Sequence, residues 1–331
     1  MSIDILFPVI LLISLALIFD FINGFHDAAN SVSTVIATGT LKPKTAIILA
    51  CIFNVVGLFI FHLSIAATIG KGIVDPIFVD FYVIGAALIG AIVWNLITWA
   101  VGLPSSSSHA LIGGVVGAIL AKVGWIGIIP AGLEKIGAFI IISPVIGLIL
   151  GFSLNWILKH TMSHKAESII YRYGQIISSC MYSIGHGSND AQKTAGIIFL
   201  ILIAGGLMQK TDDIPYWVAV ISFVVMGLGT LAGGWRIIRT MGYKITKLKQ
   251  RGGFSAEVAG SAMLFASAAL GIPVSTTHTI TGSIVGVGLS ETKKVKWKTI
   301  RKIVFAWFLT IPAAGLLSAS FYIFTKILFK S

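Results

Sequence analysis

Long apolar runs alternate with short polar segments along the whole chain. Runs of about the length that one bilayer crossing needs begin near residues 7, 45, 81, 136, 169, 217, 254 and 303. Hydrophobic residues make up 56% of the 331 residues and charged residues only 11%, more apolar surface than a soluble protein of this size can bury. The pattern predicts an all-α polytopic membrane protein. The first run lacks a basic n-region and a cleavage site, so we expect a mature helix there, not a signal peptide.

Two polar stretches interrupt these runs, at residues 23–31 and 185–194. They align with each other, so that Asp27 corresponds to Asp190. A charged side chain at membrane depth is costly and normally faces a partner or a cavity. The repetition therefore predicts one site built from two related halves, and we expect each long helix to break at its motif.

A second pair of matching stretches consists of an apolar run that stops at a proline followed by hydroxyl residues. The segments 81–121 and 254–289 turn at Pro104 and Pro273, and their tips align without a gap. The loops that flank the second segment are the most basic in the chain, so both its ends should be cytoplasmic. Its arms, of about 15 to 18 residues, are short for a crossing, which predicts a re-entrant hairpin.

These patterns predict an inverted repeat. The N-terminal repeat covers residues 1–158 and contains the hairpin 81–121, a cytoplasmic linker covers 159–168, and the C-terminal repeat covers 169–331 with the hairpin 254–289. Each repeat has three membrane spans, the first broken at its motif, and one re-entrant helical hairpin. Both termini are predicted to be extracellular. Secondary transporters have this architecture, with the binding site near the midplane.

The hairpin tips have the chemistry of an anion site, because the first turn of a helix offers unpaired N–H groups and the positive end of its dipole. The predicted phosphate-binding residues are Ser105, Ser106, Ser107, Ser108, Ser275, Thr276 and Thr277, together with Gln192 and Lys193 of the second motif. The alternative is that the hydroxyl groups only cap their helices. Repetition of both tips favours a site for a tetrahedral oxyanion.

The carboxylates would repel such an anion and are better suited to a cation. The predicted sodium ligands are Asn23, Asp27, Asn30, Asn189 and Asp190, joined by carbonyls of the broken helices. Two alternatives remain open: a proton carried by an aspartate, or an internal ion pair between Asp190 and Lys193. His109, His186 and His278 border the motifs and are expected to support them by hydrogen bonding; no metal other than sodium is predicted.

Several other function classes are disfavoured. The basic residues behind the net charge of +12 lie in short loops between apolar runs, where Lys and Arg set the orientation of a membrane protein. This placement argues against nucleic acid as a partner. The chain has no GxxxxGK[ST] motif, so we expect no nucleotide, no cofactor and transport driven by ion gradients. An intramembrane enzyme would need a nucleophile and a base, and the adjacent pairs Ser108–His109 and Thr277–His278 would point apart on a helix. A passive anion channel is the competing class, but it would not need the buried aspartates.

The motifs resemble those of the inorganic phosphate transporter (PiT) family of sodium- or proton-coupled symporters. Residues 186–194 resemble its HGxNDAQK signature, and residues 23–30 resemble its GxNDxAN motif, with His26 where the family usually has Asn. The resemblance implies a phosphate importer with aspartates in cation coupling, phosphate at the Ser/Thr tips, and a homodimer. The missing large central loop implies a compact prokaryotic form in the inner (plasma) membrane. Some relatives transport metal-phosphate complexes together with protons, and others transport sulfate. These are the alternative substrates that the resemblance leaves open.

Overall fold

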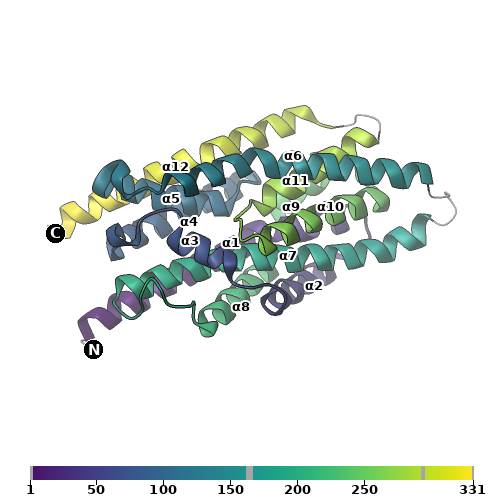
Figure 1. The fold of residues 1–331 in the computed structure, drawn as a ribbon. Coiled ribbons are helices and arrows are strands. Elements are labelled where there is room, and N and C mark those ends of the chain that lie inside the picture. The colour runs from purple at the N-terminus through teal and green to yellow at the C-terminus, as the bar shows by residue number, and fades with distance from the viewer. Residues whose placement is uncertain (1–2, 162–166, 292–294, 330–331) are drawn as a thin grey trace.

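The computed structural model describes residues 3–161, 167–291 and 295–329, and within these ranges the regular secondary structure is helical apart from one isolated bridge between Val74 and Ile128 (Figure 1). The helices are α1 (Ile3–Ala37), α2 (Pro43–Val56), α3 (Ser64–Lys71), α4 (Phe81–Val101), α5 (Ser107–Val123), α6 (Pro130–Thr161), α7 (Glu167–Ala204), α8 (Tyr216–Ala232), α9 (Trp235–Tyr243), α10 (Gln250–Ala269), α11 (Thr276–Ser290) and α12 (Trp297–Phe329). Short 3₁₀ turns lie at Gly57–Phe59, Pro76–Phe78 and Gly124–Gly127.

Within the described ranges, 5 helices are long and apolar enough to cross a membrane, and a sixth span exists if α8 and α9 are taken together. The five lie in α1, α4, α5, α6 and α12. α7, although it has 38 residues, is not among them, and it is the helix that carries the second polar motif. The expectation of an all-α polytopic membrane protein is confirmed.

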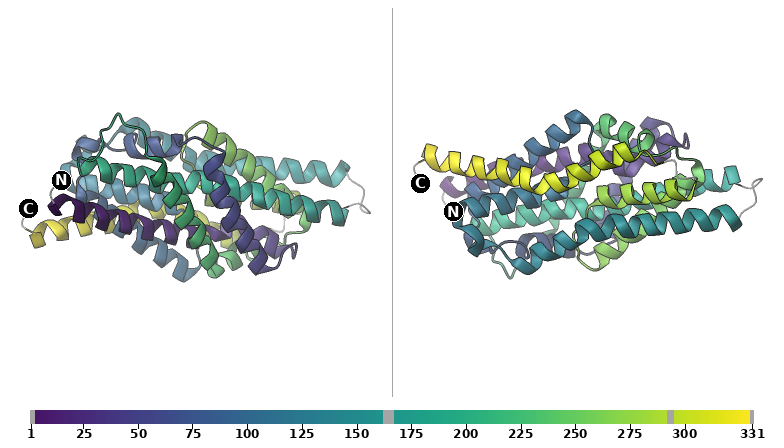
Figure 2. Two further views of the ribbon diagram at one scale, coloured as in Figure 1. Left: turned by 90° about the horizontal axis from the view of Figure 1, so that it is seen from below. Right: turned by 90° about the horizontal axis from the view of Figure 1, so that it is seen from above.

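The chain termini and the adjoining ends of α6 and α7 lie at opposite ends of the helix bundle (Figure 1). Both termini lie at one end, whereas the close of α6 and the start of α7 lie at the other, near the start of α12 (Figures 1 and 2). Of the predicted linker 159–168, α6 extends to Thr161 and α7 starts at Glu167, and residues 162–166 lie outside the described residues. The termini thus lie together, as the predicted topology requires; which side of the membrane they face stays a prediction.

The expected break in the first helix of each repeat is wrong. α1 and α7 run through their motifs as uninterrupted helices of 35 and 38 residues. The motif glycines serve close packing instead: a Cβ on Gly24 would lie 2.1 Å from the carbonyl oxygen of Met226, and one on Gly187 would lie 2.1 Å from that of Asn54. Since both helices are continuous, broken-helix carbonyls of α1 and α7 are not available as cation ligands, contrary to our expectation.

The breaks occur in the second segment of each repeat. The span expected over residues 45–69 is divided into α2, a 3₁₀ turn and α3, and the span expected over 217–235 continues from α8 into α9 with a bend of 74°. The glycine pair 233–234 lies at that bend, where Gly233 has a φ of +64°. Such a backbone favours glycine because a side chain would clash there.

Each predicted hairpin has its two outer ends fastened together by an ion pair. Lys122 at the end of α5 contacts Asp80 before α4 at 2.7 Å, and Arg251 at the start of α10 contacts Glu291 after α11 at 2.5 Å. The arms α4–α5 and α10–α11 therefore each begin and end at the same end of the bundle. The second arms pack across the halves, α5 on α12 and α11 on α6.

Candidate functional site

The polar side chains of the first motif share one face of α1. Asn23, Asp27, Asn30 and Thr34 recur at intervals of four, three and four residues, which places them one above another along a helix. All four are buried. Because α1 is continuous, this face runs past both hairpin tips and offers amide, carboxylate and hydroxyl groups to them in turn.

The second motif forms a similar line on α7, with His186, Asp190 and Lys193 at intervals of four and three residues, all of them buried. The ammonium of Lys193 donates to Asp190 Oδ1 at 2.6 Å, so the i, i+3 ion pair that the sequence left open is present. The same Nζ donates to the carbonyl oxygen of Val274, on the turn before α11, at 2.8 Å. Lys193 therefore ties α7 to the second hairpin.

Some hydroxyl groups of the tips serve the tips themselves. Ser106 is the N-cap of α5 and accepts from the backbone N–H of His109, and Ser275 is the N-cap of α11 and accepts from that of His278, both at 3.2 Å. Ser105 donates to Thr98 Oγ1 at 2.9 Å. These three residues therefore make capping or bracing contacts, and their part in phosphate binding stays a prediction.

The next two serines of the first tip face the motifs. Ser107 Oγ lies 2.6 Å from Asp27 Oδ2 and 2.5 Å from Asn23 Oδ1, and its single hydroxyl proton is shared between these two acceptors. Ser108 accepts from Lys193 Nζ at 2.5 Å. The tip of the α4–α5 hairpin thus contacts α1 and α7 at once, through a carboxylate on one side and an ammonium on the other.

The second tip is held in the same way. Thr276 Oγ1 donates to Asp190 Oδ2 at 3.1 Å, and Thr277 Oγ1 accepts from Asn30 Nδ2 at 2.9 Å. The hydroxyl of Tyr182 on α7 donates to the carbonyl oxygen of Thr276 at 2.9 Å. Four tip hydroxyls, two from each hairpin, therefore converge on the two aspartates and their neighbours.

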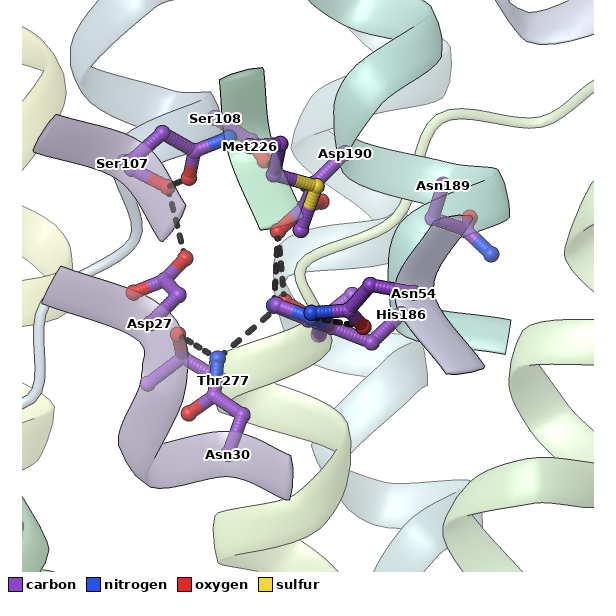
Figure 3. A network of polar contacts seen from close by, with 12 residues as sticks. Asp27, Asn30, Asn54, Ser107, Ser108, His186, Asn189, Asp190, Met226 and Thr277 are labelled. Atoms are coloured by element: carbon purple, nitrogen blue, oxygen red, sulfur yellow. Dashed lines mark hydrogen bonds and ion pairs between the residues drawn. The ribbon is translucent and has the colours of Figure 1, made fainter. Parts of the chain in front are cut away.

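The centre of this arrangement is a buried acidic cluster. Ligand atoms of Asp27, His186 and Asp190 all lie within 4.8 Å of one another, and Figure 3 shows these side chains around a common centre. Asp27 contacts His26 Nδ1 at 2.7 Å. Two carboxylates face one ammonium, that of Lys193, so with neutral histidines the cluster carries one net negative charge. Such a cluster suits a hard cation and, without one, would repel an anion.

Two predicted ligands are turned away from this centre. The side-chain oxygen of Gln192 accepts from the backbone N–H groups of Ile65 and Ala66, so this amide holds the first turn of α3. Asn189 donates to the carbonyl oxygen of Leu264 on α10 at 3.1 Å and points away from the aspartates (Figure 3). The structure does not bring either residue to the tips.

The tip histidines pack against each other. The rings of His109 and His278 lie 4.7 Å apart between centroids, and His278 stacks on Trp307 at 3.9 Å. The indole of Trp307 donates to the carbonyl oxygen of Pro104 at 3.1 Å. This stack joins the two hairpin tips directly to α12.

Sequence reasoning missed two supporting residues. Asn54 on α2 contacts His186 Nδ1 at 3.1 Å, and Thr98 on α4 contacts His26 Nε2 at 3.1 Å. Each is a polar residue within an apolar run, the kind of signal that also marked Asp27 and Asp190. Because an isolated Asn or Thr carries no charge, its burial costs less and its signal is weaker.

Two further buried carboxylates flank the cluster along α1. Thr194 donates to Asp20 Oδ1 at 2.7 Å. Glu257 on α10 accepts from Thr34 at 2.6 Å and from Ser178 at 2.5 Å. The buried acidic groups therefore extend along the helix contacts on both sides of the tips.

Known proteins resemble this chain in sequence and in fold. Residues 23–318 match the Phosphate transporter family. A probable low-affinity inorganic phosphate transporter of Rhizobium meliloti is 49% identical over 322 residues, 96% of both chains. One of Bacillus subtilis is 44% identical over 328 residues, 97% of this chain and 98% of its own. A solved structure named "The sodium-dependent phosphate transporter" has a TM-score of 0.87 at 24% identity and covers 97% of this chain and 99% of that one.

Proposed function

Because the chain belongs to the Phosphate transporter family, we propose that it imports inorganic phosphate together with sodium ions by alternating access. Members of this family and the similar proteins named above are transporters and not enzymes. The names of those relatives support phosphate as the substrate, and the name of the solved structure supports sodium as the coupling ion.

The observation that carries the proposal is the position of the acidic cluster between the two tips. Ser107 and Thr276 each donate to one of the two aspartates. An oxyanion bound by these hydroxyls would lie beside a net negative charge unless cations neutralised it. Phosphate carries one to two negative charges near neutral pH, so two bound sodium ions would roughly balance it. Each substrate then makes binding of the other more favourable, which is what symport requires.

The donor set favours sodium over a softer metal ion. Carboxylate oxygens of Asp27 and Asp190 are joined by hydroxyl oxygens and by Asn30 Oδ1, which is buried without a hydrogen-bond partner among the described residues. Hard cations prefer such all-oxygen ligands. In this proposal Asn23, Asp27, Asn30 and Asp190 hold the cations, while Ser107, Ser108, Thr276, Thr277 and Lys193 contact phosphate.

The movement is assigned to the two hairpins, which we propose to be re-entrant and related by an inverted repeat of residues 1–158 and 169–331. Matched features support the repeat: Gly102 and Gly271, with φ of +67° and +62°, open the two turns. Each hairpin alternately opens a path on its own side. We further propose a homodimer in the inner (plasma) membrane with both termini extracellular.

The alternative is a proton-coupled symporter of metal-phosphate complexes or of sulfate. The approach of His186 Nε2 to Asp190 Oδ2 at 3.3 Å favours it, because imidazole is a common ligand for transition metals. An anion channel is the remaining alternative.

Phosphate uptake into proteoliposomes, with sodium and pH gradients imposed independently, separates these functions. Sodium symport predicts accumulation driven by a sodium gradient at equal pH on both sides. Accumulation driven only by a pH gradient would replace sodium with protons, and flux without accumulation under either gradient would indicate a channel.

A further inference from the structure

A cavity of about 570 Å³ lies behind the tip of the first hairpin, beside the start of α12. Four lysines line it: Lys244 at the end of α9, and Lys296, Lys298 and Lys302 on and just before the first turns of α12. The backbone of residues 101–103 forms its inner wall. No aspartate or glutamate is among the described residues that line it. This lysine cavity has no assigned role in the transport proposal above.

The lysines of the cavity differ in what they contact. Lys296 Nζ donates to the carbonyl oxygen of Tyr243 at 3.1 Å, so this residue fixes α9 to α12. Within the part of the chain that the structure describes, no carboxylate pairs with Lys244, Lys298 or Lys302. Three ammonium groups therefore share a concave space that no described carboxylate neutralises.

The cavity lies beside the turn that leads into the first hairpin tip. Residues 101–103 line the cavity, and Ser107 and Ser108, a few residues further along the same turn, face the aspartates. Thr240, another lining residue, donates to the carbonyl oxygen of Gly102 at 2.8 Å, which fastens the turn to α9. A ligand in the cavity would thus contact the turn at residues 101–103 that leads into the tip.

The chemistry of the cavity selects its ligand class. Several ammonium groups near a membrane surface attract phosphate groups, whose oxygens accept charge-assisted hydrogen bonds. The start of α12 adds the positive end of a helix dipole beside these lysines. A neutral or cationic ligand would gain nothing from this lining.

We propose that the lysine cavity is a second phosphate-binding site, which takes a phosphate group either from the free ion or from the headgroup of an acidic phospholipid. With free phosphate as the ligand, the cavity is a station on the release side of the tip, and this role rests on the proposed function. With a phospholipid as the ligand, the headgroup holds the turn against α9.

The test compares two triple variants that remove equal charge. The cavity variant is Lys244→Gln, Lys298→Gln and Lys302→Gln, and Lys296 is kept because it holds Tyr243. The control is Lys247→Gln, Lys249→Gln and Arg301→Gln, basic residues of the α9–α10 connection and of α12 that are as exposed as the cavity lysines but do not line the cavity. Both are made in the background Asp190→Asn with Lys193→Met, which removes the ammonium proposed to contact phosphate at the transport site together with its ion-pair partner, so that binding there is weakened before the cavity is tested.

Two probes distinguish the sources of the phosphate group. Inorganic ³²P-phosphate is measured by equilibrium dialysis on lipid-depleted protein in sodium-free buffer, and phosphatidylglycerol against phosphatidylcholine is measured by native mass spectrometry. With roughly a fivefold loss for each lysine, the cavity variant should bind one of the two probes about 100-fold more weakly, while the control stays near its parent.

Absence of binding of both probes to the parent protein, or equal weakening in the two triple variants, would overturn the proposal. Neither binding measurement uses a sodium gradient. Phosphate binding in the cavity can therefore be confirmed even if sodium-driven uptake fails, and sodium-driven uptake can be confirmed even if the cavity binds neither probe.

Discussion

At the scale of single residues, Asp27 and Asp190 have the same side chain but different partners. Asp190 is paired with the ammonium of Lys193, whereas the close ionisable partner of Asp27 is His26. Removing one member of a buried ion pair leaves the other charge uncompensated, at a cost of about 3 to 5 kcal/mol. The two aspartates should therefore differ in what their substitution does to the fold, even if both hold cations.

The first prediction uses this difference. Asp27→Asn and Asp190→Asn should each abolish sodium-driven phosphate uptake, but only Asp190→Asn should also lower thermal stability, because it strands Lys193. The double variant Asp190→Asn with Lys193→Met should regain stability without regaining uptake. Uptake is measured in proteoliposomes and stability in detergent. Sodium-driven uptake at the wild-type rate in Asp27→Asn would contradict the assignment.

The tip hydroxyls provide a second prediction. Ser107→Ala and Thr276→Val should weaken phosphate binding, because each removes a hydroxyl group that we propose to contact phosphate. Ser106→Ala and Ser275→Ala should instead cost about 1 kcal/mol of stability each, the usual loss for an N-cap, with a smaller effect on phosphate affinity. Calorimetric titration and thermal unfolding of the four variants separate the roles. Equal loss of phosphate affinity in all four would mean that capping and binding are not divided in this way.

At the scale of the elements, the motif glycines determine how closely four helices approach. Gly24 on α1 packs against α8, and Gly187 on α7 packs against α2. At both positions the neighbouring backbone is too close for a Cβ atom. We therefore expect Gly24→Ala and Gly187→Ala to destabilise the protein by about 1 to 3 kcal/mol, as overpacking does. Gly137→Ala in α6 is the matched control, because no atom of the described residues around it lies within 4 Å of its added Cβ. Thermal unfolding in detergent is the measurement, and equal stability of all three variants would refute close packing.

The ion pair at the base of the second hairpin leads to a pH prediction. Partial burial raises the pKa of the Glu291 carboxyl, but hydrogen bonds from Arg251 and Asn155 outweigh burial, so the pKa lies below its ordinary value. A lowered pKa stabilises the fold above the ordinary pKa of glutamate, about 4.3, and this stability is lost as the pH falls through the folded value. Because the pair is partly exposed, its contribution should stay below about 1 kcal/mol.

The measurement is the melting temperature of the wild type and of Glu291→Gln as a function of pH. The difference between them should be full near pH 7 and vanish in acid. Glu134→Gln, at an exposed position on α6, serves as the control. A difference that grows as the pH falls would contradict the sign of the pKa shift.

These elements also show where sequence reasoning succeeded and where it failed. The turns between α4 and α5 and between α10 and α11 were predictable because a proline followed by hydroxyl residues marks both. The continuous helices were not, because a glycine within a polar motif is compatible with a break and with close packing alike. Only the positions of Met226 and Asn54 decide between the two. The orientation of Gln192 was equally inaccessible, since its partners lie on α3.

At the scale of the whole molecule, both termini lie at one end of the bundle (Figure 1). The basic loops predict which side of the membrane that end faces, and this orientation is testable. In a background with Cys51 and Cys180 replaced by serine, single cysteines at Asp213 and at Lys247 should differ in their reaction with an impermeant maleimide on intact cells. Asp213 should be labelled from outside and Lys247 only after permeabilisation. Labelling of both positions from the same side would contradict the predicted orientation.

The measurement closest to the central claim is the affinity of the purified protein for phosphate as a function of sodium concentration. If cations at Asp27 and Asp190 offset the charge that phosphate brings to the tips, the dissociation constant should fall at least about tenfold as sodium replaces choline, a coupling of about 1.4 kcal/mol. Asp27→Asn should remove that dependence. A phosphate affinity that is the same with and without sodium in the wild type would contradict the account.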